Sequence, residues 1–229
     1  MNLSGTNLEN ARQHNRRVVM EAIRLHGRLS RADITRLTGL TPQTISNITA
    51  ELHDWGFLSA LPPEPAGRGQ PAVPFVLNPR GAYSIGLQLN QHALNAVVVN
   101  LAGDILATAN CRVNRPTPSE ALEPIQSAIA SLQSNTDLDW KRVLGVGVAI
   151  PGPFGVEGMS AVGPTTLPGW KDLSVGERLS QAVGLPVAVA NDGTAAAIGE
   201  RLYGNGLALR SFAYIYIGEG LGAGLFLNG

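Results

Sequence analysis

The stretch that decides the fold of the first third of the chain is "SRADITRLTGLTPQTISNITAELHDWG", residues 30–56. Ser30 stands before a short apolar pattern, and Asp33 follows three residues later, which is the arrangement of a capping box at a helix start. Thr41 and Pro42 open a further helix, because proline at the first helical position gives up no hydrogen bond. The letters "TGL" between the two helices indicate a tight turn. The stretch therefore predicts two helices joined by a short turn.

A longer helix is expected ahead of this pair, so that residues 10–56 form three helices. Gly27 is expected to end the first helix, since glycine favours that position. The apolar stripe expected on it is Val18, Val19, Ala22, Ile23 and Leu25. The inward residues expected on the next two helices are Ile34, Leu37, Ile45, Ile48 and Leu52.

Two helices around a glycine-containing turn are typical of a helix-turn-helix, whose second helix enters the major groove by its N-terminal residues. The outward residues at that end are Gln43, Thr44, Ser46 and Asn47. These short polar groups suit base edges and phosphates, and no acidic residue follows until Glu51. The pattern predicts DNA binding, although a three-helix bundle with a polar face would show the same residues.

Two short apolar runs, residues 57–61 and 73–77, follow the third helix and flank a proline- and glycine-rich tip. A hairpin in this position is a wing. Its tip "GRGQP" places Arg68 between glycines, where its guanidinium is expected to enter a narrow minor groove. A flexible linker is the alternative interpretation.

The composition is that of an ordinary folded chain: 229 residues, 44% hydrophobic, 15% charged, with zero net charge. Residues 1–80 carry nine Lys/Arg against six Asp/Glu, and all nine are arginines. Arginine favours bidentate phosphate and base-edge contacts, which fits a nucleic-acid partner. The surplus is too small to establish that partner by itself.

Cys111 is the only cysteine, which excludes an internal disulfide framework and a cysteine zinc cluster within these residues. The four histidines show no metal-ligand spacing. No apolar signal segment begins the sequence, and no apolar run reaches the length of a membrane span. These observations predict a cytoplasmic protein without a membrane partner.

From Gly81 the pattern changes to three alternating apolar runs, which predict an antiparallel meander. A helix is expected over residues 119–134. The run "VLGVGVAIPGP" that follows is expected to be a strand covered on both faces of a sheet. Further elements are expected in the order helix (173–183), strand ("PVAVAN"), helix (192–203) and strand ("SFAYIYIG"). Strands that alternate with helices favour a mixed α/β fold.

Four motifs of this second part carry a resemblance: "GVGVAIPGP" (145–153), "LPGWKDL" (167–173), "GLPVAVANDGTAAAIGERLYG" (184–204) and "IGEGLGAGLFLNG" (217–229). In order, spacing and wording they resemble the ROK family of repressors, open reading frames and sugar kinases over about 150 residues. The resemblance implies a ribonuclease H-like, actin-type ATPase fold. With a winged helix in front, the chain looks like a ROK transcriptional regulator of the NagC/XylR type. The implied domains are residues 1–79, a winged helix-turn-helix, and residues 80–229, the ROK domain.

Both nucleotide loops of the ROK kinases are altered in this sequence. Where the kinases have an Asp followed by Gly-Gly-Thr-Lys, this chain has Gln88 and then residues 90–93, "NQHA". Where the second loop of a kinase reads Gly-Thr-Gly, this chain places Glu219 between two glycines, and its charge opposes a polyphosphate. The resemblance thus implies a protein that is not an enzyme.

The sugar side of the family site is better preserved. Asn191 and Asp192 match the family's Asn-Asp pair, whose Asp is the general base of the kinases and whose side chains bind sugar hydroxyls. Gly152 is expected in the same cleft, and Thr166 stands where the kinases have a sugar-binding Asn. Helix capping is the alternative role for the pair, because Asn191 lies directly before a helix.

The family normally continues into a zinc motif and the rest of a second lobe, so the sequence is expected to be truncated there and to hold no cofactor. The leading hypothesis is a regulator, expected to be a repressor, of carbohydrate-metabolism genes. Its expected partners are operator DNA, a sugar-type effector and a second copy in a homodimer. The alternatives are a ROK-type sugar kinase with an N-terminal helical extension, and a degenerate fragment without function.

Overall fold

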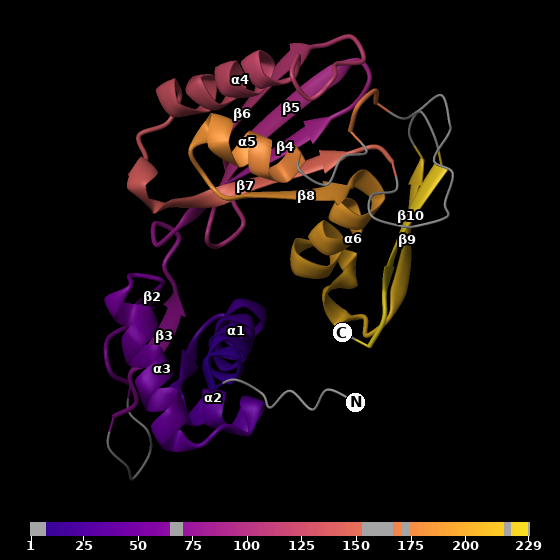
Figure 1. Cartoon of the computed structure of the whole chain (residues 1–229). Coiled ribbons are helices and arrows are strands. Elements are labelled where there is room, and N and C mark those ends of the chain that lie inside the picture. Colours follow the sequence, from indigo (N-terminus) through magenta and orange to yellow (C-terminus); the bar gives the residue numbers. More distant parts are fainter. Residues whose placement is uncertain (1–7, 65–70, 153–166, 171–174, 218–220, 229) are drawn as a thin grey trace. The chain divides into compact units, whose positions relative to one another are not determined.

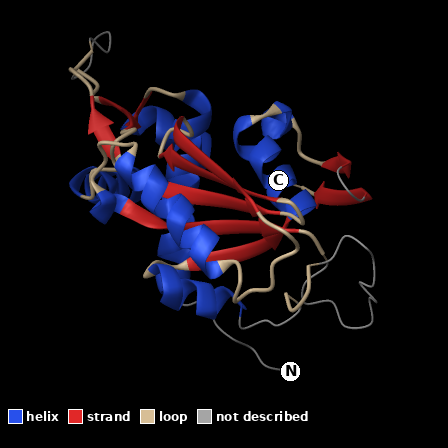
Figure 2. Cartoon of the chain, turned by 90° about the horizontal axis from the view of Figure 1, so that it is seen from above, coloured by secondary structure: helices blue, strands red, loops and turns tan. Residues whose placement is uncertain are grey.

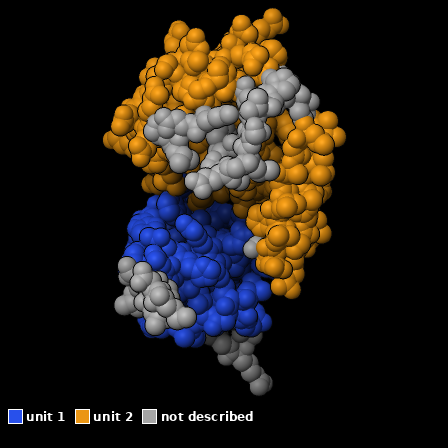
Figure 3. Space-filling view, turned by 45° about the vertical axis from the view of Figure 1, so that its right-hand side comes forward, with its two compact units in different colours: residues 1–82 blue, residues 83–229 orange. Residues whose placement is uncertain are grey.

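The computed structural model describes residues 8–64, 71–152, 167–170, 175–217 and 221–228. The chain divides into two compact units, residues 1–82 and residues 83–229 (Figure 3). Among the described residues, no helix combines the length and the apolar character that crossing a membrane requires. Arg68, Thr166 and Glu219 lie outside the described residues.

The first unit consists of three helices and a small antiparallel sheet (Figure 1). Its strands lie in the order β1-β3-β2, and the expected hairpin of β2 and β3 is confirmed. Strand β1 has only two residues and was not expected. The elements in chain order are α1 (Leu8–His26), β1 (Leu29–Ser30), α2 (Arg31–Thr38), α3 (Pro42–Asp54), β2 (Leu58–Ala60) and β3 (Pro74–Leu77).

Side-chain caps start both α2 and α3. The Ser30 hydroxyl accepts from the Asp33 backbone N–H at 3.2 Å, and the Asp33 carboxylate accepts from the Ser30 N–H at 3.0 Å. This confirms the capping box. Gly39 ends α2 at a φ of 69°, a left-handed conformation that favours glycine. The Thr41 hydroxyl accepts from the Thr44 N–H at 3.2 Å, ahead of Pro42 at the first helical position.

Two leucines expected in the core of this unit are exposed instead. Leu25 is 42% exposed and Leu37 is 51% exposed, so both expectations were wrong. Each residue turns the helix by about 100°, which places Leu25 about 200° from the buried Ile23. Helix α2 has only eight residues, and Ile34 is the one that it buries completely.

A five-stranded mixed sheet organises the second unit, in the order β6-β5-β4-β7-β8. Strands β4, β5 and β6 are antiparallel, which confirms the meander, whereas β7 and β8 run parallel to β4. The strands are β4 (Tyr83–Leu89), β5 (Ala93–Asn100), β6 (Ile105–Arg112), β7 (Val143–Ile150) and β8 (Val187–Asn191).

Helices α4 (Leu122–Ser134) and α5 (Val175–Val183) cover one face of this sheet (Figure 2). Helix α4 begins three residues after the expected start, and a turn precedes it. Trp170 lies in the same core at 2% exposure, and its indole N–H donates to the Pro116 carbonyl at 2.8 Å. That bond ties the segment before α5 to the segment after β6.

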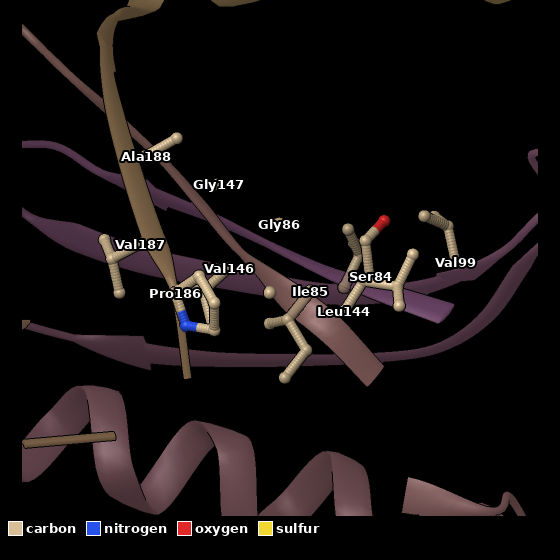
Figure 4. A pocket seen from close by; sticks show the side chains of 12 residues that line it. Ser84, Ile85, Gly86, Val99, Leu144, Val146, Gly147, Pro186, Val187 and Ala188 are labelled. Carbon is tan, nitrogen blue, oxygen red and sulfur yellow. The ribbon is translucent and has the colours of Figure 1, made fainter. Parts of the chain in front are cut away.

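The opposite face of the sheet is open in the described residues. It bears a hollow of about 570 Å³, and Figure 4 shows Leu144, Val99 and Val187 around it. Within the described residues β7 is therefore covered on one face only, whereas cover on both faces was expected. Its valines face the helices, whereas Leu144, at 56% exposure, and the neighbouring glycines face the hollow. The glycines made an alternating strand look continuously apolar.

The unit ends with α6 (Asp192–Tyr203), a short 3-10 turn (Asn205–Ala208), and the hairpin of β9 (Phe212–Ile217) and β10 (Leu221–Phe226). Helix α6 packs directly on β10. A Cβ built on Gly224 would come within 2.5 Å of the Ala197 Cβ and of the Gly193 carbonyl oxygen. Only glycine therefore permits this approach, which places the first turn of α6 against the hairpin.

Candidate functional site

The first candidate site is the exposed N-terminal end of α3. Gln43 and Asn47 are exposed, and Thr44 and Ser46 are partly buried. The Gln43 side-chain amide donates to the Asn47 side-chain oxygen at 2.9 Å, one helical turn away. The two amides thus hold each other side by side on one face of the helix, each with further hydrogen-bonding groups to offer a ligand.

The charge near this end suits a polyanion. The first turn of α3 contains no acidic residue. Glu51, farther along the helix, accepts from Arg16 Nη2 at 2.6 Å and from Arg12 Nη2 at 3.0 Å. The hydrogen bonds from Arg16, together with the charge of Arg12, lower the pKa of Glu51. The carboxylate therefore stays ionised, and the α1 arginines compensate its charge.

The hairpin after α3 extends beyond its two strands. Glu64 and Ala72 form an isolated bridge, in which each backbone N–H donates to the other's carbonyl at 2.8 and 2.9 Å. The Glu64 side chain pairs with Arg28. Arg68, the residue predicted for the minor groove, lies outside the described residues, and its role stays a prediction.

The second candidate site is the start of α6. The Asn191 side-chain oxygen accepts from the Gly193 and Thr194 backbone N–H groups at 2.9 and 3.3 Å. Its amide donates to the Gly152 carbonyl at 2.5 Å. The capping role of Asn191 is therefore confirmed. The same side chain also ties the end of β7 to the start of α6, and so brings Gly152 to this site.

Asp192 supplies the charge of this second site. Burial raises the pKa of its carboxyl, against the opposing effect of the Gly193 backbone N–H, which donates to Asp192 Oδ1 at 2.8 Å. A half-buried carboxylate can accept hydrogen bonds from hydroxyl groups, and its charge repels phosphate. Thr166, which was expected at the same site, lies outside the described residues.

The turn between β4 and β5 is the place of the first phosphate loop. Here the Asn90 side-chain oxygen accepts from the His92 and Ala93 backbone N–H groups at 2.9 and 2.7 Å. These two N–H groups thus point to a side chain and not to a ligand. The Gln88 side-chain oxygen accepts from the Asn95 amide at 3.4 Å. Glu219, of the second loop, lies outside the described residues.

One arginine beside α3 was missed in the sequence. Arg31 Nε donates to the Thr49 hydroxyl of α3 at 2.9 Å, and the guanidinium carbon lies 4.8 Å from the centre of the Phe75 ring in β3. An arginine directly after the capping serine was visible in the sequence. Its partners were not, because Thr49 and Phe75 meet it only through the tertiary fold.

A sequence profile described as the ROK family matches residues 84–229. The chain is 24% identical over 223 residues to the DNA-binding transcriptional repressor Mlc of Escherichia coli (strain K12), covering 97% of this chain and 55% of Mlc. It is 21% identical over 214 residues to the xylose repressor of Bacillus subtilis (strain 168), covering 93% of this chain and 55% of the repressor. The chain thus spans about half the length of these curated relatives.

Solved structures of two kinds are similar to this fold. A ROK family transcriptional regulator, described as a homolog of the E. coli MLC protein, has a TM-score of 0.76 and 29% identity, covering 96% of this chain and 55% of its own. A ROK family glucokinase from Streptomyces griseus, in complex with glucose and AMPPNP, has a TM-score of 0.54 and 28% identity. That match covers 64% of this chain and 45% of the glucokinase.

Proposed function

The chain belongs to the ROK family, and from that premise we propose that it is a DNA-binding transcriptional regulator of carbohydrate-metabolism genes. In the simplest case it is a repressor. The similarity to Mlc and to a xylose repressor supports this proposal because it extends over nearly the whole chain, the helices before the ROK profile included. The glucokinase match, in contrast, covers 64% of the chain.

In this proposal residues 1–79 are a winged helix-turn-helix and residues 80–229 a ROK domain with the ribonuclease H-like, actin-type fold. Helix α3 would lie in the major groove, with Gln43, Thr44, Ser46 and Asn47 toward the bases or phosphates, and Arg68 would enter the minor groove. The observation that carries the proposal is the start of α3: exposed paired amides without an acidic residue in the first turn.

We propose further that Asp192 accepts hydrogen bonds from the hydroxyl groups of a sugar-type effector, with Asn191 and Gly152 shaping the site and Thr166 completing it. No zinc or nucleotide is part of this proposal. A homodimer on an inverted repeat would place two copies of α3 in successive major grooves.

The test compares specific and random DNA. A duplex is selected from a random library on the wild-type chain, and binding is then measured to it and to a random-sequence duplex. Asn47→Ala should weaken the selected duplex by about 1–3 kcal/mol if Asn47 makes a good base contact, and random DNA far less. Equal losses on both duplexes would contradict base reading by Asn47. Failure of the wild type to enrich any sequence would contradict the function.

A sugar kinase with an N-terminal helical extension is the second candidate. It is favoured by Asp192 at the start of α6 and by the fold shared with the glucokinase. Gln88 and the Asn90 turn argue against it, because neither offers a magnesium-organising carboxylate or a free phosphate loop. ADP release measured with ATP, magnesium and a panel of sugars separates the two: release that depends on a sugar and is lost in Asp192→Asn would favour the kinase.

A further inference from the structure

Carboxylates pair with most of the arginines that the structure describes in residues 8–82. Such a pairing reduces the attraction of a guanidinium for another anion. The paired arginines are Arg12 and Arg16 with Glu51, Arg24 with Glu21, Arg28 with Glu64, and Arg36 with Asp33. In this described part of the chain no carboxylate pairs with Arg17, Arg31 or Arg80.

Arg31 differs from the other two because neutral groups fix its guanidinium. Thr49 accepts from its Nε at 2.9 Å, and the Phe75 ring lies 4.8 Å from its guanidinium carbon. Both partners are themselves held firmly. The Thr49 side chain is fully buried and donates to the Ile45 carbonyl at 2.8 Å, and Phe75 is 2% exposed. Arg31 itself is exposed, so its two Nη groups remain available to a ligand.

We propose that Arg31 is a preorganised contact to a DNA backbone phosphate. This inference rests on the proposed function, and it adds a residue outside the recognition helix. Arg31 is the first residue of α2, and in a helix-turn-helix the first helix of the pair crosses the phosphate backbone while the second lies in the major groove. Arginine Nη groups bind two phosphate oxygens at once in one plane.

The fixed geometry strengthens this contact. A free arginine side chain loses rotamer entropy when it is ordered by a ligand. Arg31 has already lost much of that freedom to Thr49 and Phe75 before DNA arrives. The nearest acidic group along α2, Asp33, is bound by Ser30 and Arg36 and opposes the phosphate little.

The salt dependence of binding tests this assignment. Affinity for the selected duplex and for a random-sequence duplex of the same length is measured across a series of salt concentrations. Arg31→Ala should weaken both about tenfold and reduce the slope of log K against log salt by about 0.9, the value for one phosphate contact. Arg24→Ala is the matched control: it removes the same charge from a guanidinium that Glu21 already pairs with, and should leave the slope unchanged.

Two conservative variants distinguish the phosphate contact of Arg31 from the hydrogen bond to Thr49 that positions its guanidinium. Arg31→Lys keeps the charge but lacks the planar fork, so it should lower affinity about threefold with the wild-type slope. Thr49→Val removes the acceptor for Nε and keeps the side-chain volume. It should weaken binding in the wild type but have no further effect in Arg31→Ala, which a double-mutant cycle measures. Thermal unfolding of each variant checks that the chain is folded.

These measurements separate a failure of the Arg31 phosphate contact from a failure of the proposed function. If the wild type binds the selected duplex and Arg31→Ala changes neither the affinity nor its salt dependence, the proposed phosphate contact is wrong. The proposed function as a DNA-binding regulator is then unaffected. A loss on the selected duplex alone would assign Arg31 to base reading and overturn the phosphate role. If the wild type shows no salt-dependent binding to either duplex, the proposed function as a DNA-binding regulator is itself wrong.

Discussion

Helices α3 and α6 begin in the same way and differ in charge. In each, a side chain before the first turn accepts from backbone N–H groups, Thr41 from Thr44 and Asn191 from Gly193 and Thr194. The first turn of α3 has no acidic residue, whereas α6 begins with Asp192, whose carboxyl has a raised pKa because it is half-buried. We therefore propose that the start of α3 is open to a polyanion, whereas the start of α6 repels phosphate and accepts hydroxyl groups.

The cap geometry of a helix therefore does not identify its ligand. Backbone N–H groups at a helix start attract anions in general. The side chains of the first turn decide whether an anion can approach. In this chain the same local structure is therefore proposed to face DNA in one unit and a sugar in the other.

The largest effect is expected when a carboxylate is added to the start of α3, which then has the same charge as the start of α6. Gln43→Glu places a carboxylate in the first turn of α3, where it favours the helix but opposes DNA phosphates. We expect affinity for the selected duplex to fall roughly 100-fold or more, since like charges at an interface cost several kcal/mol. Fluorescence anisotropy with a labelled duplex measures the loss.

Gln133→Glu is the matched control for this change. Gln133 is exposed on α4 in the second unit, so the same chemical change is made on a different helix of a different unit. Comparable losses in the two variants would mean that the start of α3 has no special place in DNA binding.

The converse variant removes the carboxylate from the start of α6. Asp192→Asn keeps the size of the side chain but removes the carboxylate, so the sugar-dependent change of operator affinity should disappear. Such couplings are typically 5- to 150-fold. DNA binding without sugar should stay near the wild-type value. Asp137→Asn, at an exposed position, is the control; a sugar response that survives in Asp192→Asn would remove Asp192 from the site.

The smallest expected effect is on stability. The pKa of Asp192 is raised in the folded chain, so the folded state holds its proton more tightly than the unfolded state. Ionisation therefore lowers the free energy of unfolding as pH rises above the ordinary pKa of an aspartate carboxyl. Asp192→Asn should raise the melting temperature slightly at about pH 7, and this gain should vanish at about pH 3. A lower melting temperature for Asp192→Asn at neutral pH would show that burial is not the dominant influence.

The starts of α2, α3 and α6 were predictable from the sequence because their determinants are local. Ser30, Asp33, Thr41 and Pro42 each act within one turn of their own helix. The same holds for Asn191 before α6. The tertiary structure is therefore not needed to locate the starts of these three helices.

The incorrect predictions concern side chains whose burial depends on residues far away in the sequence. Periodicity placed Leu37 in the core, but α2 is too short to bury it. Strand β7 was expected to be covered on both faces, because composition does not show that its valines and glycines lie on opposite sides. The contact between Arg31 and Phe75 could not be predicted for the same reason, because Phe75 lies in β3, which follows the whole of α3 in the sequence.

The position of Trp170 gives the second unit an optical signal of its own. Its indole ring is enclosed in the sheet–helix core and hydrogen-bonded to Pro116, so its fluorescence emission should be blue-shifted in the folded chain. Trp55 of the first unit is 44% exposed and lies under the Arg16 guanidinium, which places it in a more polar environment. With a phenylalanine at position 55, the emission of Trp140 and Trp170 would follow the melting of the second unit alone.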